Sequence, residues 1–252
     1  MQNFYRLFLK YFFNLPYAIG ITSYIRFLYY FHIKKNFKLY YSNKDTNNNL
    51  PVKNSETVIQ NQTKHTVNTF KNFFYNIRHK FNGKRSSILI DPLKSIDCLN
   101  FKNAKVLSIG PRLESEIFNL IKNGFQKKNI SALDLQSYSP LIKLGDMNKI
   151  PFNDNSFDIV FSGWVLSYSN EIEKAASEMI RTVKNGGFIA IGVSNKPDKQ
   201  FSCNSLSCSN EIKQYFERHI DTTIFSYHPG DFINKVDQNK FFRCALIMRI
   251  QK

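Results

Sequence analysis

The chain has 252 residues, a formal net charge of +16, 24 phenylalanines and 13 tyrosines. Its length suits one α/β domain of about 150 residues plus an extension, and the aromatic side chains can fill the core. The longest uncharged run near the N-terminus, residues 11–25, is shorter than the roughly 20 apolar residues that a membrane-spanning helix needs, which argues against such a helix. Recurring charges argue against a secretory signal as well.

The N-terminal segment, residues 1–40, combines aromatic and basic side chains. Residues 1–100 hold 15 Lys/Arg against 4 Asp/Glu, a net +11, whereas residues 101–252 hold 20 against 15, a net +5. Three interpretations stay open for residues 4–37: a helical lobe with buried aromatics, a segment at a membrane surface, or a nucleic-acid surface. Nucleic acid is disfavoured, because no regular basic stripe or RNA-reading motif is present.

Residues 41–99 connect this segment to the main domain, residues 100–252. Residues 41–70 have few apolar side chains and predict a polar linker or loop. Residues 71–99 are expected to be a helical lead-in, with a helix from Lys71 to Arg85 and a turn at Asp91-Pro92 before the first strand.

From residue 106 onward, short apolar runs alternate with stretches of helix length. The runs are 106–110, 130–134, 157–161 and 187–193, followed by a short helix at 211–218 and strands at 222–227 and 241–250. This spacing predicts βαβ units and a parallel sheet, in which ligands bind at the carboxyl ends of the strands.

A glycine and an aspartate end the first two runs. Asp134 follows Gly110 by 24 positions, and an acidic residue about 20 positions after the first glycine is where a ribose is held. The alternative is that Asp134 only caps a helix or stabilises a turn.

Three segments together resemble the class I S-adenosylmethionine-dependent methyltransferases, in particular the methyltransferase type 11-like group. They are Gly145-Asp146-Met147 with Pro151-Phe152, then Asn155-Ser156-Phe157-Asp158, then residues 176–187. The resemblance covers residues 100–195 well. It implies an α/β, Rossmann-like methyltransferase fold, with a mostly parallel seven-stranded sheet, helices on both faces and an antiparallel last strand, to which the N-terminal extension is added.

The resemblance also implies S-adenosylmethionine as the cofactor and assigns residues to it. Asp134, followed by Leu135, would accept hydrogen bonds from both ribose hydroxyls. Asp146 would bind the adenine amino group, and Met147 would pack on the ring. Gly110 would let the backbone approach the methionine end of the cofactor.

The first loop departs from the family pattern. The family reads acidic-x-Gly-x-Gly-x-Gly, whereas this chain has Ser108-Ile109-Gly110-Pro111-Arg112-Leu113-Glu114, with one of the three glycines and no acidic residue at its start. Pro111 also removes a backbone donor. Arg112 either binds the cofactor carboxylate through a charge-assisted bond or pairs with Glu114 or Glu116.

Residues 162–169 follow the fourth strand, where the family lines its methyl-acceptor site. Trp164 would contact cofactor or acceptor there, or else be a core aromatic. Methyl transfer depends largely on holding the reacting groups in line, so no catalytic base is assigned. The cysteine spacing does not match a zinc site, and four thiols without a secretory signal indicate a reducing, cytoplasmic location.

These observations predict an S-adenosylmethionine-dependent methyltransferase that acts on a small-molecule, sugar or lipid-linked acceptor. The alternative is a non-catalytic methyltransferase-like domain that binds a ligand or a protein. A cytoplasmic location is expected, and association with a membrane through residues 4–37 stays open. Neither the acceptor nor the oligomeric state follows from the sequence.

Overall fold

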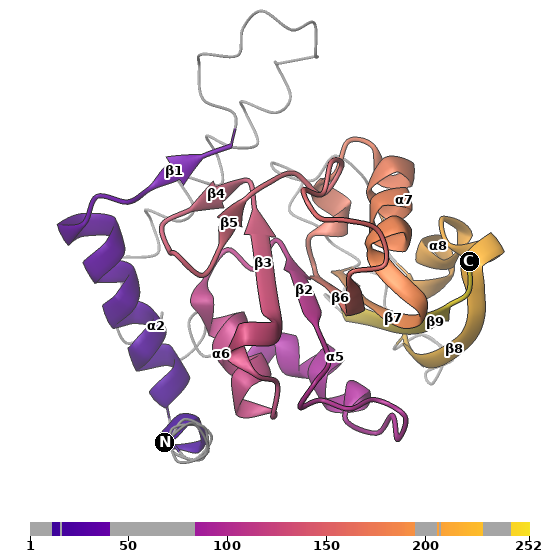
Figure 1. The fold of residues 1–252 in the computed structure, drawn as a ribbon, viewed down its shortest axis with the longest axis horizontal. Helices are drawn as coiled ribbons and strands as arrows, with labels where there is room; N and C mark the ends of the chain where they lie inside the picture. Colours follow the sequence, from indigo (N-terminus) through magenta and orange to yellow (C-terminus); the bar gives the residue numbers. More distant parts are fainter. Residues whose placement is uncertain (1–11, 16, 41–83, 195–205, 207, 229–242) are drawn as a thin grey trace, which may run out of the picture.

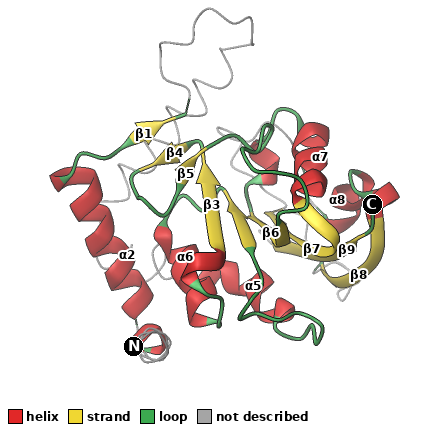
Figure 2. Cartoon of the chain, in the orientation of Figure 1, coloured by secondary structure: helices red, strands yellow, loops and turns green. Residues whose placement is uncertain are grey.

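A seven-stranded sheet forms the centre of the molecule in the computed structural model (Figures 1 and 2). The structure describes residues 12–15, 17–40, 84–194, 206, 208–228 and 243–252. The strands lie in the order β5-β3-β2-β6-β7-β9-β8. They are β2 (Val106–Ile109), β3 (Ile130–Asp134), β5 (Lys143–Leu144), β6 (Phe157–Gly163), β7 (Val183–Ser194), β8 (Ile220–Tyr227) and β9 (Arg243–Ile250).

Strand directions confirm the predicted Rossmann-like architecture. Strands β5, β3, β2, β6 and β7 are parallel, whereas the last strand, β9, is antiparallel to both β7 and β8. The central strands are buried on both faces, as parallel strands covered by helices must be. Their apolar runs are continuous for this reason.

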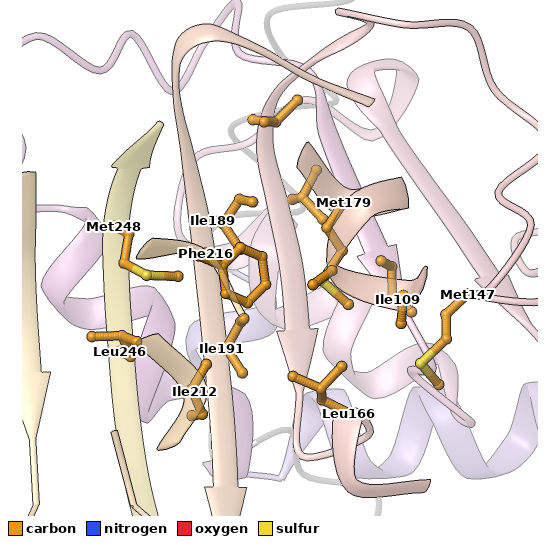
Figure 3. Packing of buried hydrophobic residues seen from close by; sticks show 14 of the residues in the cluster. Ile109, Met147, Leu166, Met179, Ile189, Ile191, Ile212, Phe216, Leu246 and Met248 are labelled. Atoms are coloured by element: carbon orange, nitrogen blue, oxygen red, sulfur yellow. The ribbon is translucent and has the colours of Figure 1, made fainter. Parts of the chain in front are cut away.

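Helices cover both faces of the sheet. On one face, α7 (Ile172–Thr182) places Met179 in the same apolar cluster as Leu107 and Ile109 of β2; Figure 3 shows part of this cluster. On the other face, α5 (Lys84–Leu93) and α6 (Glu114–Lys122) pack against Val106 and Ile159. A short helix, α8 (Ser209–Gln214), and a 3-10 turn, η5 (Glu217–His219), replace the single helix expected at 211–218.

The turn expected at Asp91-Pro92 is wrong, because helix α5 continues through it. Leu89, Ile90 and Leu93 lie at helical spacing and are fully buried against the sheet, which rewards helix formation. Pro92 occupies the last turn. There it removes only one backbone hydrogen bond. Residues 71–83 of the expected lead-in and the expected linker, 41–70, lie outside the described residues.

The N-terminal segment packs along the side of the domain. Helix α2 (Ala18–Leu28) lies beside α6 and continues into a π turn, η1 (Tyr29–Ile33) (Figure 1). A short strand, β1 (Lys38–Leu39), then pairs antiparallel with β4 (Gln136–Ser137). Aromatic side chains face the domain: Phe13, Tyr24 and Phe27 are buried. One face of this basic and aromatic segment therefore packs against the domain as an ordinary buried surface.

Candidate functional site

The register of the sheet brings the predicted residues to one edge. Ile109 of β2 is paired with Leu133 of β3 on one side and with Ser162 of β6 on the other. The next residue along each strand is therefore level with its neighbours, which places Gly110, Asp134 and Gly163 side by side. This is the carboxyl edge of the parallel sheet, where α/β proteins bind ligands.

Gly110 adopts a left-handed backbone with a φ of 66°. Its N–H donates to the Leu133 carbonyl at 2.9 Å, so the pairing of β2 with β3 continues to this residue. A Cβ at this position would lie 2.8 Å from the Cβ of Val165 and closer still to its Cγ2. The glycine is thus required by the packing of Val165, a neighbour that the sequence did not reveal. Its role toward a ligand stays a prediction.

Asp134 is buried and ties the first loop to the end of β3. One carboxylate oxygen accepts a hydrogen bond from the Arg112 backbone N–H at 2.9 Å, and the other accepts from the Gln136 N–H at 3.2 Å. Burial raises the pKa of Asp134, and these hydrogen bonds oppose the rise. Each carboxylate oxygen can accept a second hydrogen bond. Asp134 therefore stabilises the turn, and its carboxylate can still accept hydrogen bonds from hydroxyl groups.

Arg112 forms no ion pair with either of the two nearby glutamates, Glu114 and Glu116. Glu114 accepts from Arg26 of α2 at 2.5 and 2.8 Å, and Glu116 accepts from the Ser108 hydroxyl. Within the described residues, the Arg112 guanidinium forms no ion pair shorter than 4.0 Å. The alternative in which Arg112 pairs with either glutamate is therefore not what the structure contains.

Asp146 and Met147 follow β5 at the same edge. The Asp146 carboxylate accepts from the Asn148 backbone N–H at 2.8 Å, which stabilises the turn. Met147 is only 7% exposed and lies beside Ile109 in the apolar core (Figure 3). Leu135, next to Asp134, accepts a hydrogen bond from the Tyr40 N–H through its carbonyl at 2.8 Å, which links the N-terminal segment to this edge.

Trp164 begins the segment after β6 with a left-handed backbone, φ 62°. Its N–H donates to the Gly192 carbonyl at 2.8 Å, and its ring lies so close to Gly192 that a Cβ there would stand 2.8 Å from Cε2. The guanidinium carbon of Arg85 lies 4.7 Å from the ring centroid. Within the described residues, the buried indole N–H has no hydrogen-bond partner. A ligand acceptor would remove the cost of that unpaired donor.

Residues 119–191, from α6 into β7, match the family model described as a methyltransferase domain. This part of the chain is similar to methyltransferase domains. The first loop, residues 108–116, precedes the matched region.

Curated relatives resemble this domain over short stretches. Demethylmenaquinone methyltransferase of Desulfitobacterium hafniense (strain Y51) is 46% identical over 54 residues, which is 21% of each chain. Phosphoethanolamine N-methyltransferase 1 of Triticum aestivum is 39% identical over 71 residues, 27% of this chain and 13% of that protein. The matched stretches thus span about a fifth of the first relative and less of the second.

A solved structure resembles the domain over a longer range. The 1,6-didemethyltoxoflavin-N1-methyltransferase of Burkholderia thailandensis, solved with 1,6-didemethyltoxoflavin and S-adenosylhomocysteine, aligns with a TM-score of 0.55 over 82% of this chain and 93% of its own. At 12% identity, the likeness establishes a shared fold. In the part of the chain that the structure describes, no helix is long and apolar enough to span a bilayer.

Proposed function

We propose that the protein is an S-adenosylmethionine-dependent methyltransferase that acts on a small-molecule or lipid-linked acceptor. The observation that carries the proposal is Asp134, a buried carboxylate held by two backbone N–H groups at the carboxyl edge of a methyltransferase-type sheet. The small-molecule methyltransferases among the relatives support this class of acceptor.

The residues at the edge suit the parts of this cofactor. Asp134, beside Leu135, would accept the ribose hydroxyls, and Asp146 would accept the adenine amino group. Near the first loop, Gly110 and the guanidinium of Arg112, which forms no ion pair within the described residues, would take the methionine end. The cofactor supplies a methyl group on a sulfonium.

The chain's contribution to methyl transfer would be to hold the acceptor in line and to exclude water. Two side chains at this edge are relevant. Met147 is already packed in the core beside Ile109, so it offers the adenine ring an apolar boundary. Trp164 would border the acceptor and has a free indole donor within the described residues.

Replacing Asp134 with alanine is expected to weaken binding of S-adenosylhomocysteine by about 1 to 3 kcal/mol, roughly 5- to 150-fold in Kd. The loss follows because the ribose hydroxyls would lose their buried acceptor. Titration calorimetry measures the change, and thermal unfolding checks that the loop tethered by Asp134 still folds. Unchanged affinity in a folded variant would remove this residue from the site. Asp91→Ala, on the exposed side of α5, is the control.

We further propose that the enzyme works at the cytoplasmic surface of a membrane, through the outer side of its N-terminal helix. Five apolar residues recur there every fourth position: Tyr17, Ile21, Ile25, Tyr29 and Ile33. Their exposed fractions range from 41% for Tyr29 to 71% for Ile33. These five residues are called the apolar stripe.

Charge and packing support a lipid surface as the partner of the apolar stripe. Residues 1–44 contain seven Lys/Arg and no Asp or Glu, so this end of the chain complements anionic headgroups. Exposed Lys34 and Lys35 directly follow the stripe. The opposite side of the helix is fixed to the domain by buried Tyr24 and Phe27, so the stripe is held outward. Within the described residues, Cys98 and Cys208 are free thiols, which supports a reducing compartment.

Replacing Ile21 and Ile25 with serine is expected to lower partitioning onto vesicles containing phosphatidylserine by about tenfold or more, since each removes an apolar side chain from the interface. Sedimentation with vesicles measures the effect. Ile224→Ser, at a similarly exposed position on β8, should leave partitioning unchanged. Equal partitioning of all variants would contradict the proposal. The proposal would also be contradicted if the serine variants lost self-association and kept their lipid binding.

A further inference from the structure

The acidic residue missing from the start of the first loop is replaced in space by a residue from helix α6. Strand β2 ends Leu107-Ser108-Ile109-Gly110, with a serine where the family pattern has an acid. Glu116, eight residues after Ser108, turns back from the first turn of α6 and accepts a hydrogen bond from the Ser108 hydroxyl through Oε1. A carboxylate therefore lies beside the end of β2 although β2 itself carries none.

The second carboxylate oxygen of Glu116 points at the backbone of the neighbouring strand. A Cβ on Gly163, at the end of β6, would lie 3.0 Å from Oε2, so only a glycine leaves the carboxylate its full space. Within the described residues, Glu116 makes the one hydrogen bond to Ser108 and no ion pair within 4.0 Å. Oε2 can thus accept a hydrogen bond, and no cation of the described residues lies within 4.0 Å of it.

Glu114 and Glu116, both in the first turn of α6, differ in whether a cation pairs with the carboxylate. Glu114, fully buried, is matched by the guanidinium of Arg26 at 2.5 Å. Among the described residues, no cation forms an ion pair with Glu116, although withdrawing an unpaired carboxylate from water is costly. Burial accordingly raises the pKa of Glu116 to about 7, opposed by the Ser108 hydrogen bond and by the charge of Arg85. A ligand cation would remove that cost.

We infer that the carboxylate of Glu116, positioned by Ser108, binds the ammonium group at the amino-acid end of the cofactor. This inference rests on the proposed function and assigns one further contact in that site. Arg112, whose guanidinium is unpaired within the described residues, leaves the loop next to it and would take the cofactor's carboxylate. Glu116 and Arg112, an acid and a base on the two sides of Gly110, would thus recognise the zwitterionic end of the cofactor. These charge-assisted bonds would take the place of the missing glycines of the loop.

The test compares two ligands that differ only at the amino-acid end. S-Adenosylhomocysteine carries the ammonium group, whereas 5′-methylthioadenosine has the same nucleoside and thioether without it. Glu116→Gln is expected to weaken binding of S-adenosylhomocysteine about 10- to 100-fold, the range for losing a hydrogen bond to a charged group, and to leave 5′-methylthioadenosine within about twofold. Glu173→Gln, another acid in the first turn of a helix, is the matched control.

The outcomes separate this inference from the proposed function. An equal loss for both ligands would show a merely structural role for Glu116, and no loss for either would exclude the contact; each result overturns the inference. A wild-type protein that binds neither ligand would instead contradict the proposed function. Ser108→Ala keeps the carboxylate of Glu116 but removes the hydroxyl that positions it. A smaller loss of affinity, confined to S-adenosylhomocysteine, is therefore expected.

A pH titration of the wild-type protein provides a readout that does not depend on any variant. The ammonium group binds the ionised carboxylate, so affinity for S-adenosylhomocysteine should rise as the pH increases through about 7. The groups that face Glu116 are Ser108 of β2, Arg85 of α5 and Asp134 of β3. Affinity for 5′-methylthioadenosine should show no such rise, and Glu116→Gln should abolish it. A rise that persists in the glutamine variant would contradict the inference.

Discussion

Replacing Gly110 with alanine is expected to lower the free energy of unfolding by about 2 to 5 kcal/mol. The left-handed backbone at φ 66° costs an alanine about 1 to 2 kcal/mol. The added Cβ would also lie 2.8 Å from the Cβ of Val165 and nearer to its Cγ2, and overpacking of this kind costs about 1 to 3 kcal/mol. The first cost arises in the backbone of residue 110 and the second in the contact of its new Cβ with Val165, and the range given is their sum.

Urea unfolding measures this prediction, provided the slope of unfolding against denaturant stays constant. Gly186→Ala is the matched control, since Gly186 has a similar left-handed φ, 74°, and a Cβ there would meet Arg249 only at 3.6 Å, an ordinary van der Waals distance. It should lose the backbone cost alone. The double variant with Val165→Ala should recover the packing cost. A Gly110→Ala loss no greater than that of Gly186→Ala would contradict the packing cost assigned to Val165.

Replacing Arg26 with alanine is expected to cost about 3 to 5 kcal/mol, because it leaves a fully buried carboxylate without its cation. Arg26 lies on α2 and donates to both oxygens of Glu114, at 2.5 and 2.8 Å. The side chain of Glu114 has 0% exposure, whereas that of Arg26 keeps 30%, which favours the lower end of the range. The same change should loosen α2 from α6, and amide exchange in residues 18–28 would report it.

An exposed ion pair provides the comparison for Arg26. Lys174 and Glu171 lie 3.0 Å apart with both side chains at least half exposed, so Lys174→Ala should cost less than about 1 kcal/mol. The double variant Arg26→Ala with Glu114→Gln should recover part of the loss, because the amide carries no charge. Equal effects of Arg26→Ala and Lys174→Ala would mean that the N-terminal helix is not held by this pair.

Local sequence patterns predicted the strands that carry the site. Residues 130–134 form β3 as expected, because a short apolar run ending in aspartate is both buried and followed by a turn. The turn predicted from Asp91-Pro92 was wrong, because burial of Leu93 outweighs the missing N–H of one proline. Turn residues signal only what the backbone prefers before packing is considered.

Contacts between distant residues were beyond local patterns. Arg26 and Glu114 are 88 residues apart, and nothing in either segment indicates the other. Glu116 appeared in the sequence only as a possible partner of Arg112; its bond to Ser108 depends on the rotation of α6 over the sheet. A serine at the end of the first strand, followed eight residues later by a glutamate in the first turn of the next helix, is the signal that could have indicated this contact.

Titration calorimetry of the wild-type protein with S-adenosylmethionine and S-adenosylhomocysteine tests the central claim most directly. The claim is that the altered first loop still binds this cofactor at the carboxyl edge of the sheet. Binding of both with a Kd of about 1 μM, near −8 kcal/mol, is the predicted result. No binding of either to the folded protein would contradict the claim. It would favour a non-catalytic methyltransferase-like domain whose partner is sought at the N-terminal segment.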